Sequence, residues 1–318
     1  MFVSRVSPMV KDATILVTGG RGLVGSALVN ALREAGFTNV VAPSHAELEL
    51  TNRDVTQNFF AVHKPRYVFH LASMVFGLVG NMKNQIESLS QNTVINNNLI
   101  MACAHHGVKK VFFAGTVASY PFPYKALPLR EDYLWEGSPH YGEYGYANAK
   151  RHALSYLEIL SKEKGMDYCY GLLTNMYGPN DKFDPQFGHV IPSLVKKLDH
   201  ALVEGADFCV WGDGTAKRDF LFIEDAARAI IACQENLSGV VNIASGETVT
   251  IRDVVEALVE ASGYAGPIVW EKDKPVGIPE RSIDTNGLKS TGFTCHYDLR
   301  TGLKKTWDWY VENRQLAR

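Results

Sequence analysis

Residues 13–25 read ATILVTGGRGLVG, an apolar run that passes directly into a glycine-rich turn. The apolar run predicts a buried strand, and apolar residues at helical spacing after the turn predict a helix that ends near Gly36. Gly19, Gly22 and Gly25 give the turn the spacing GxxGxxG. Between a strand and a helix, such glycines let a pyrophosphate approach the free N–H groups at the helix N-terminus. The stretch therefore predicts a dinucleotide-binding α/β fold.

Short apolar strands alternate with helices through the following 150 residues. Further strands are expected at residues 40–42, 67–71, 111–114 and 167–173. Helices are expected at residues 55–63, 92–106 and 146–164. This alternation is typical of an α/β protein with a doubly wound parallel sheet, the Rossmann fold.

The sequence changes character after Tyr177-Gly178-Pro179-Asn180, where a loop-like stretch follows and a new helix begins. We expect a dinucleotide-binding domain over residues 1–178 and a smaller C-terminal substrate domain over residues 179–318. Some segments of the second half are expected to return to the first domain. The length of 318 residues fits two domains of ordinary size.

Charge and hydropathy exclude several classes of function. The chain carries 32 Lys and Arg against 34 Asp and Glu, a net charge of −2, whereas nucleic-acid-binding domains are usually basic. No apolar run reaches the roughly 18 residues that a membrane span needs. We therefore expect neither a nucleic-acid partner nor a membrane.

The five cysteines are scattered and form no CxxC pair, so the sequence suggests neither a zinc site nor a disulfide framework. Free buried thiols are typical of a reducing compartment. The first ten residues lack the long apolar stretch of a signal peptide. A cytoplasmic protein without a metal is the expectation.

The end of the second expected strand bears on the choice of cofactor. NAD enzymes usually place an acid there to bond the ribose hydroxyls, but the nearest acid, Glu47, comes several residues late. Arg21 in the glycine turn, assisted by Ser44 and His45, is suited to a 2′-phosphate. The sequence favours NADP(H), and NAD(H) stays open, because an exposed Arg21 without a ligand is the alternative.

Tyr146 and Lys150 form a YxxxK pattern on an expected helix, and their spacing places both side chains on one face. An ammonium beside a phenol favours the phenolate, so we expect Lys150 to lower the pKa of Tyr146 towards neutrality for acid–base work. An exposed pair without function is the usual meaning of the bare pattern. Its place downstream of a nucleotide-binding turn favours catalysis.

A hydroxyl follows the fourth expected strand, where parallel sheets hold their ligands. Thr116 and Ser119 are the candidates to hydrogen-bond the oxygen that is made or consumed in the reaction. A threonine at a strand end also commonly caps the backbone, which is the alternative for Thr116.

With these three motifs in order, the chain resembles the extended short-chain dehydrogenase/reductases, and within them the GDP-L-fucose synthase family. The resemblance covers nearly the whole chain. The matching stretches include GGRGLVGSA, YGYANAKR, TNMYGPNDKFDPQFGHVIP and VWGDGTAKRDFLFIEDAA.

The resemblance implies roles for individual residues. Tyr146 and Lys150 fall on the catalytic pair, Thr116 on the catalytic serine, and His189 on a residue used in epimerisation. The residues implied for the nucleotide sugar are Asn175, His189, Lys197, Trp211, Arg218 and Arg281. The expected cofactor contacts are Gly19, Arg21, Gly22, Leu23, Val24, Gly25, Ser44, His45, Leu71, Ala72 and Lys150. Without the resemblance, Lys197 would be taken for a solvated helix residue and Trp211 for a core residue.

Departures from the family pattern qualify the expected activity. Ala118 stands where the family carries the epimerisation cysteine, so we expect chemistry at C4 without epimerisation at C3 and C5. Met74 and Phe76 replace a usual lysine and glycine, and Val276 replaces a common aspartate. These changes predict an altered sugar.

The resemblance thus implies an NAD(P)-dependent oxidoreductase that acts at C4 of a GDP-linked sugar. A C4 dehydrogenase or C4 epimerase of a GDP-hexose or GDP-heptose with tightly bound NAD is the enzymatic alternative. A non-catalytic dinucleotide sensor is the alternative from another class, and the intact glycine turn and YxxxK pair disfavour it. The family also implies a homodimer, with helices 92–106 and 146–164 as candidate contacts.

Overall fold

A six-stranded sheet forms the centre of the computed structural model, which describes residues 8–76, 78–185, 188–274 and 277–315. Its strand order is β10-β5-β4-β3-β1-β2, and every neighbouring pair is parallel. The strands are β1 (Ile15–Thr18), β2 (Val40–Val41), β3 (Tyr67–His70), β4 (Lys110–Thr116), β5 (Asp167–Leu173) and β10 (Gly239–Ile243). Parallel strands covered on both faces are apolar throughout, and β1 and β3 are buried at every position.

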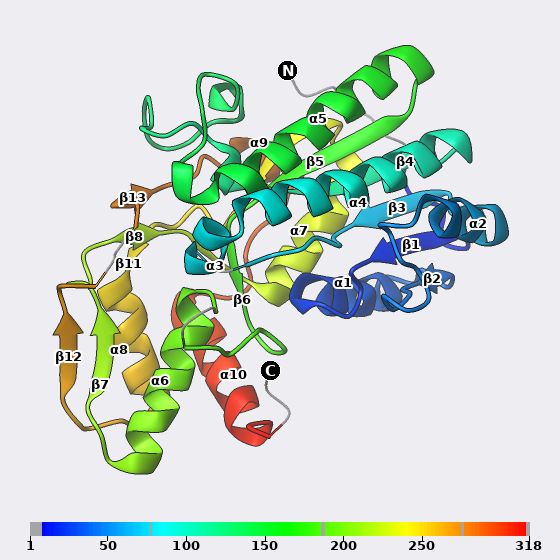
Figure 1. The fold of residues 1–318 in the computed structure, drawn as a ribbon. Helices are drawn as coiled ribbons and strands as arrows, with labels where there is room; N and C mark the ends of the chain where they lie inside the picture. The colour runs from blue at the N-terminus through cyan, green and yellow to red at the C-terminus, as the bar shows by residue number, and fades with distance from the viewer. Residues whose placement is uncertain (1–7, 77, 186–187, 275–276, 316–318) are drawn as a thin grey trace.

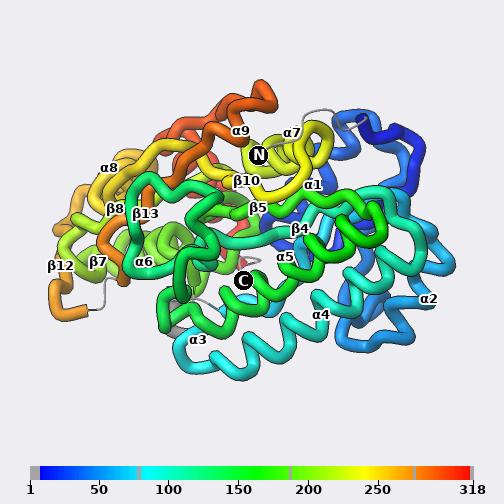
Figure 2. The backbone as a smooth tube through the Cα atoms, turned by 90° about the horizontal axis from the view of Figure 1, so that it is seen from above, coloured from blue at the N-terminus to red at the C-terminus, as the bar shows by residue number. Residues whose placement is uncertain are grey.

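Helices cover both faces of this sheet (Figures 1 and 2). One face carries α2 (Arg53–His63), α4 (Gln85–His105) and α5 (Tyr144–Lys164). The other carries α1 (Leu23–Glu34) and α7 (Ile223–Asn236). Successive side chains of a strand point to opposite faces of the sheet. Leu16 and Val68 therefore pack under α2, α4 and α5, whereas Val17 and Phe69 pack under α1 and α7.

The C-terminal half builds a smaller unit at one end of the sheet (Figure 1). The short helix α9 (Asn286–Lys289) returns to the large sheet and contacts β10. The helices of the smaller unit are α6 (Val190–Glu204), α8 (Ile251–Ser262) and α10 (Leu299–Glu312). Its strands are β6 (Asn175–Tyr177), β7 (Phe208–Trp211), β8 (Lys217–Arg218), β9 (Phe220–Phe222), β11 (Val249–Thr250), β12 (Ile268–Glu271) and β13 (Glu280–Arg281). They pair as β11-β8-β13, β12-β7 and β6-β9. A short helix, α3 (Leu78–Lys83), precedes α4.

The doubly wound parallel sheet is confirmed, and the predicted elements of the first half all form. The largest displacement is at α4, which begins at Gln85 and not at Asn92. β10 comes from beyond residue 178 and completes the large sheet beside β5. The division into domains at residue 178 stays a prediction.

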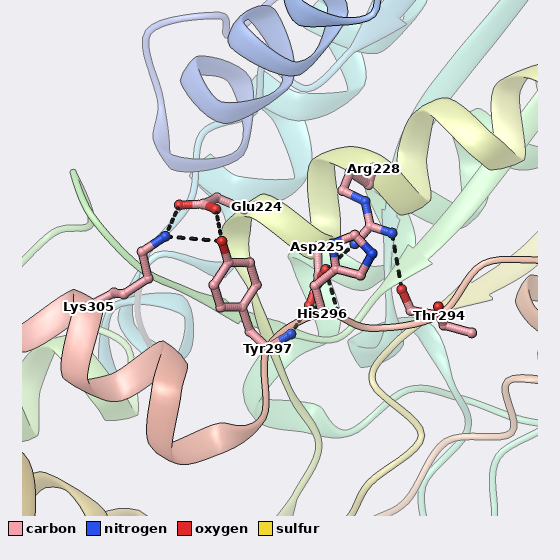
Figure 3. Close-up of polar contacts among 7 residues, drawn as sticks. All are labelled: Glu224, Asp225, Arg228, Thr294, His296, Tyr297 and Lys305. Atoms are coloured by element: carbon pink, nitrogen blue, oxygen red, sulfur yellow. Dashed lines mark hydrogen bonds and ion pairs between the residues drawn. The ribbon is translucent and has the colours of Figure 1, made fainter.

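The N-terminus of α7 fastens the segment that leads into α10 (Figure 3). The fully buried Asp225 carboxylate accepts hydrogen bonds from the backbone N–H groups of His296 (3.0 Å) and Tyr297 (2.9 Å), and it pairs with Arg228. The neighbouring Glu224 accepts from the Tyr297 hydroxyl and from Lys305. Residues 71 and 72 positions apart in the chain are thereby held together.

Asp225→Ala is expected to lower the free energy of unfolding by about 3–5 kcal/mol, because it leaves buried N–H groups without an acceptor and a cation without its partner. Urea unfolding of both proteins measures the loss. Asp308→Ala, which removes an exposed i,i+4 pair with Lys304, is the matched control and should cost less than about 1 kcal/mol. Equal losses in the two variants would contradict the role assigned to Asp225.

Candidate active site

The glycine turn lies at the carboxyl end of β1, as the sequence predicts. Gly19 has φ +72°, and a Cβ there would lie 2.8 Å from the backbone nitrogen of Ala72. A Cβ on Gly25 would collide with the carbonyl of Gly19. Only glycine allows both the turn and this close packing. Leu71 and Ala72 therefore lie directly against the turn. The glycine turn and the start of α1, at Gly22, Leu23 and Val24, fit a pyrophosphate.

A buried network holds the turn in place. The Thr18 hydroxyl and the Nδ1 atom of His70 are 2.8 Å apart, and His70 Nε2 lies 3.1 Å from Asn96 Oδ1. Since the Asn96 carbonyl accepts, Nε2 carries the proton and Nδ1 accepts from Thr18. Burial lowers the pKa of His70 to about 3. This imidazole stays neutral at physiological pH and serves the framework.

The residues expected near the adenosine ribose gather on the surface beside two acids. The Glu47 carboxylate accepts from the Ser44 backbone (2.7 Å) and hydroxyl (2.6 Å) and lies 3.6 Å from the Arg21 guanidinium. His45 pairs with Glu49 at 2.8 Å. Glu47 comes several residues after the end of β2, but a tight turn at Ser44 brings its carboxylate close to Arg21. A 2′-phosphate would have to compete with Glu47 for Arg21.

Tyr146 and Lys150 lie on the first turns of α5, with Lys150 Nζ 5.6 Å from the centre of the Tyr146 ring. Lys150 is 1% exposed, and burial lowers its pKa to about 7. Burial raises the pKa of Tyr146 to about 12. The expectation that Lys150 lowers the pKa of Tyr146 towards neutrality is wrong. Desolvation of the phenol is the largest cause of its raised pKa, and the charge of Glu143 adds to it.

Two residues near Tyr146 were missed by the sequence analysis. A hydrogen bond with Ser73 partly offsets the raised pKa of Tyr146. The Ser73 hydroxyl donates to Asn92 Oδ1 at 2.7 Å, and the Asn92 amide also bonds both backbone groups of Met74. Asn92 is fully buried in α4 and fixes the segment that faces the phenol. The sequence signal for this pair is a polar residue, Asn92, within a helix, and a hydroxyl, Ser73, shortly after the end of β3.

Thr116 ends β4, and its hydroxyl oxygen accepts from the backbone N–H of Ala118 at 3.1 Å. This capping leaves the Thr116 hydroxyl proton available as a donor. Ala118 is 4% exposed within a 3₁₀ turn, Val117–Ser119. Ser119 is fully buried and reaches Ala147 O at 3.5 Å, so Thr116 is the better candidate of the two hydroxyls.

The residues implied for the sugar nucleotide come from five elements of the C-terminal half: β6, α6, β7, β8 and β13. Lys197 of α6 lies over the Trp211 ring of β7, 4.7 Å from its centre. Trp211 is 36% exposed, which excludes a core role. The Asn175 amide donates to Asp219 O at 3.0 Å. Asp219 itself is buried and accepts from the Ser245 and Gly246 backbone, so it fixes the turn beside Asn175.

Arg218 and Arg281 are register partners in β8 and β13. His189 is exposed at the N-cap position of α6, and its side chain makes no capping hydrogen bond. The nearby Asp181 is buried, and burial raises the pKa of its carboxyl while the charge of His189 lowers it. Met74 is half-buried, and Val276 lies outside the described residues.

In the described ranges no cluster of three or more His, Cys, Asp or Glu residues suits a metal ion. All five cysteines are free thiols. The described helices include none that is long and apolar enough to span a membrane.

Comparison with known proteins agrees with this geometry. The chain is 40% identical to GDP-L-fucose synthase 1 of Arabidopsis thaliana over 314 residues, which span 98% of this chain and 97% of that protein. The NADP-bound structure of a GDP-L-fucose synthetase from Naegleria fowleri superposes with a TM-score of 0.92 at 28% identity, covering 99% and 98% of the two chains. The NADP-bound GDP-mannoheptose C4 reductase of Campylobacter jejuni gives 0.85 at 28% identity, covering 95% and 99%.

A family model matches residues 15–244, from the first strand of the sheet to the turn after β10. It spans the glycine turn, the end of β4 and the Tyr146–Lys150 pair. The resemblance to the GDP-L-fucose synthases is thus confirmed at the level of sequence, fold and family. The chain belongs to the NAD dependent epimerase/dehydratase family.

Proposed function

We propose that the protein is an NADP(H)-dependent reductase of the C4 carbonyl of a GDP-linked sugar. The observation that carries the proposal is the position of the buried Lys150, whose Nζ atom lies 5.6 Å from the centre of the Tyr146 ring and 4.9 Å from that of Phe113 in β4. Relatives that act on GDP-sugars, among them a C4 reductase, supply the substrate class.

The proposed chemistry needs one proton donor and one oxygen-binding group from the chain. A bound reduced nicotinamide would supply the hydride. The raised pKa of Tyr146 keeps its phenol protonated at neutral pH, which is the form that a proton donor to the C4 oxygen requires. Thr116 donates a hydrogen bond to the same oxygen, and the Lys150 ammonium stabilises the phenolate that remains.

Arg21 supports NADP(H) over NAD(H), although Glu47 opposes it. Arg21→Ala is expected to weaken NADPH binding about tenfold and to leave NADH nearly unchanged, since only NADPH offers a phosphate to the guanidinium. Glu47→Gln should tighten NADPH binding, because the competing carboxylate charge is gone. Calorimetric titration measures all three proteins. A clear NADH preference of the unmutated protein would contradict the proposal and favour the alternative with bound NAD.

The proposal also includes C4 reduction without epimerisation at C3 and C5. Epimerisation removes a carbon-bound proton and returns one from the other face, which usually takes two opposed groups. Ala118 has no ionisable group, and only His189 stands at an epimerisation position. The adjacent Ser119 is buried and is a poor acid or base near pH 7 without an activating partner.

A homodimer through α4 and α5 is part of the proposal. These helices pack against each other, and their outer faces expose apolar side chains: Ile86, Leu89, Val94, Met101 and Ile159. Sedimentation of the protein tests the association.

A panel of GDP-4-keto-sugars incubated with NADPH tests the proposed function at least cost. Loss of NADPH absorbance with at least one member is expected. No turnover with any GDP-sugar, in either redox direction, would support a non-catalytic dinucleotide-binding protein.

A further inference from the structure

Two arginines lie side by side on neighbouring strands of the β11-β8-β13 sheet. Arg218 and Arg281 are directly paired in register. Arg281 is 8% exposed, and Arg218 is half-buried. Burial, together with the charge of Arg281, lowers the pKa of Arg218 to about 10. Within the described residues Arg218 makes no ion pair, and its guanidinium donates to its neighbour's carbonyl, Lys217 O, at 2.7 Å.

Arg281, in contrast, hydrogen-bonds two side chains through its guanidinium group. Its Nη2 atom donates to the Glu143 carboxylate at 2.9 Å, and its Nε atom donates to the Tyr124 hydroxyl at 2.7 Å. Burial alone would lower the pKa of Arg281, but Glu143 and Tyr124 hold it above its usual value. Two guanidinium groups against one carboxylate leave a surplus positive charge at this place, which suits an anion.

Glu143 occupies a special position in the chain. It is the residue before α5, and Tyr146 follows three residues later in the first turn of that helix. The ion pair with Arg281 therefore ties the C-terminal half to the start of the catalytic helix across 138 residues of sequence. The Glu143 charge also contributes to the raised pKa of Tyr146.

We propose that Glu143 is a positioning residue that couples diphosphate binding at the Arg218–Arg281 pair to the placement of Tyr146. The inference rests on the proposed function, in which the substrate carries a nucleoside diphosphate. The diphosphate supplies the negative charge that the arginine pair lacks. Arg281 then connects the diphosphate to the Glu143 carboxylate, and Glu143 is the residue from which α5 begins. Binding energy from the non-reacting part of the substrate is in this way used to orient the proton donor.

The kinetic test compares three variants. Glu143→Ala removes the tie, and kcat should fall roughly 10- to 100-fold while KM changes little, because small misplacements of a reacting group cost about that much. Glu143→Gln keeps an acceptor oxygen for Arg281 and should restore kcat to within about threefold of the unmutated enzyme. Glu136→Gln removes an exposed ion pair with Lys125 in the preceding loop and is the matched control. An unchanged kcat in Glu143→Ala would overturn the inference.

The binding test needs no turnover. Glu143→Gln raises the charge of the cluster by one unit, so inorganic pyrophosphate and GDP should bind several-fold tighter in calorimetry, whereas a merely structural role predicts weaker binding. Weaker binding of both ligands would overturn the inference. An unmutated protein that binds pyrophosphate but reduces no GDP-4-keto-sugar would contradict the proposed function alone, and the calorimetric comparison would still decide the role of Glu143.

Discussion

Tyr146→Phe is expected to reduce kcat by roughly 10²–10⁴-fold while GDP binding stays within about twofold. The substitution removes the phenolic proton and leaves the ring, which packs beside Lys150. Because the phenol has its pKa raised to about 12, it is protonated at neutral pH and is the donor that the C4 oxygen needs. Steady-state rates and calorimetry with GDP measure the two effects.

Tyr144→Phe is the matched control, since Tyr144 lies on the same turn of α5 but is exposed. Its turnover should equal that of the unmutated enzyme. If Tyr146→Phe kept its rate within tenfold of the unmutated enzyme, Tyr146 would not be the proton donor.

Lys150→Met is expected to abolish most turnover and, at the same time, to stabilise the protein without ligands. Lys150 has its pKa lowered from 10.5 to about 7 by burial. Between these two pH values the unfolded chain binds the proton more strongly, so the unmutated protein gains stability as pH rises. Below about pH 7 both states are protonated and the full penalty for burying the charge applies.

The stability advantage of Lys150→Met should therefore be largest below pH 7 and should shrink by up to about 1.4 kcal/mol per pH unit towards pH 10.5. Urea unfolding at pH 6, 8 and 9.5 measures this dependence. Lys162→Met, an exposed lysine on the same helix, is the control and should show no such trend. If the difference in unfolding free energy between Lys150→Met and the unmutated protein did not depend on pH, burial would not be what lowers the pKa of Lys150.

Much of the fold follows from local patterns. The strands of the large sheet are short apolar runs that end in glycine or polar residues, and their alternation with helices dictates a parallel sheet. The start of α4 was placed seven residues late, because its first turns are polar and carry Ile86, which is 85% exposed. Two-residue strands such as β8 and β13 carry no periodicity, so their pairing was not predictable.

The site divides in the same way. Tyr146 and Lys150 were found because four residues along a helix place them together. Glu143, Tyr124 and Ser73 were missed, since each reaches its partner through the tertiary fold and not through sequence spacing. The predicted shift in the pKa of Tyr146 has the wrong direction, because the YxxxK motif does not show that the phenol is buried.

The most direct test of the central claim is NMR analysis of a GDP-4-keto-sugar incubated with the enzyme and NADPH in D₂O. We expect a product reduced at C4 that carries no deuterium at C3 or C5 above the control without enzyme, because Ala118 leaves no second group for epimerisation. Rapid deuterium entry at both C3 and C5 would contradict the account. A C4 carbonyl that stays unreduced in every GDP-4-keto-sugar tested would contradict it as well.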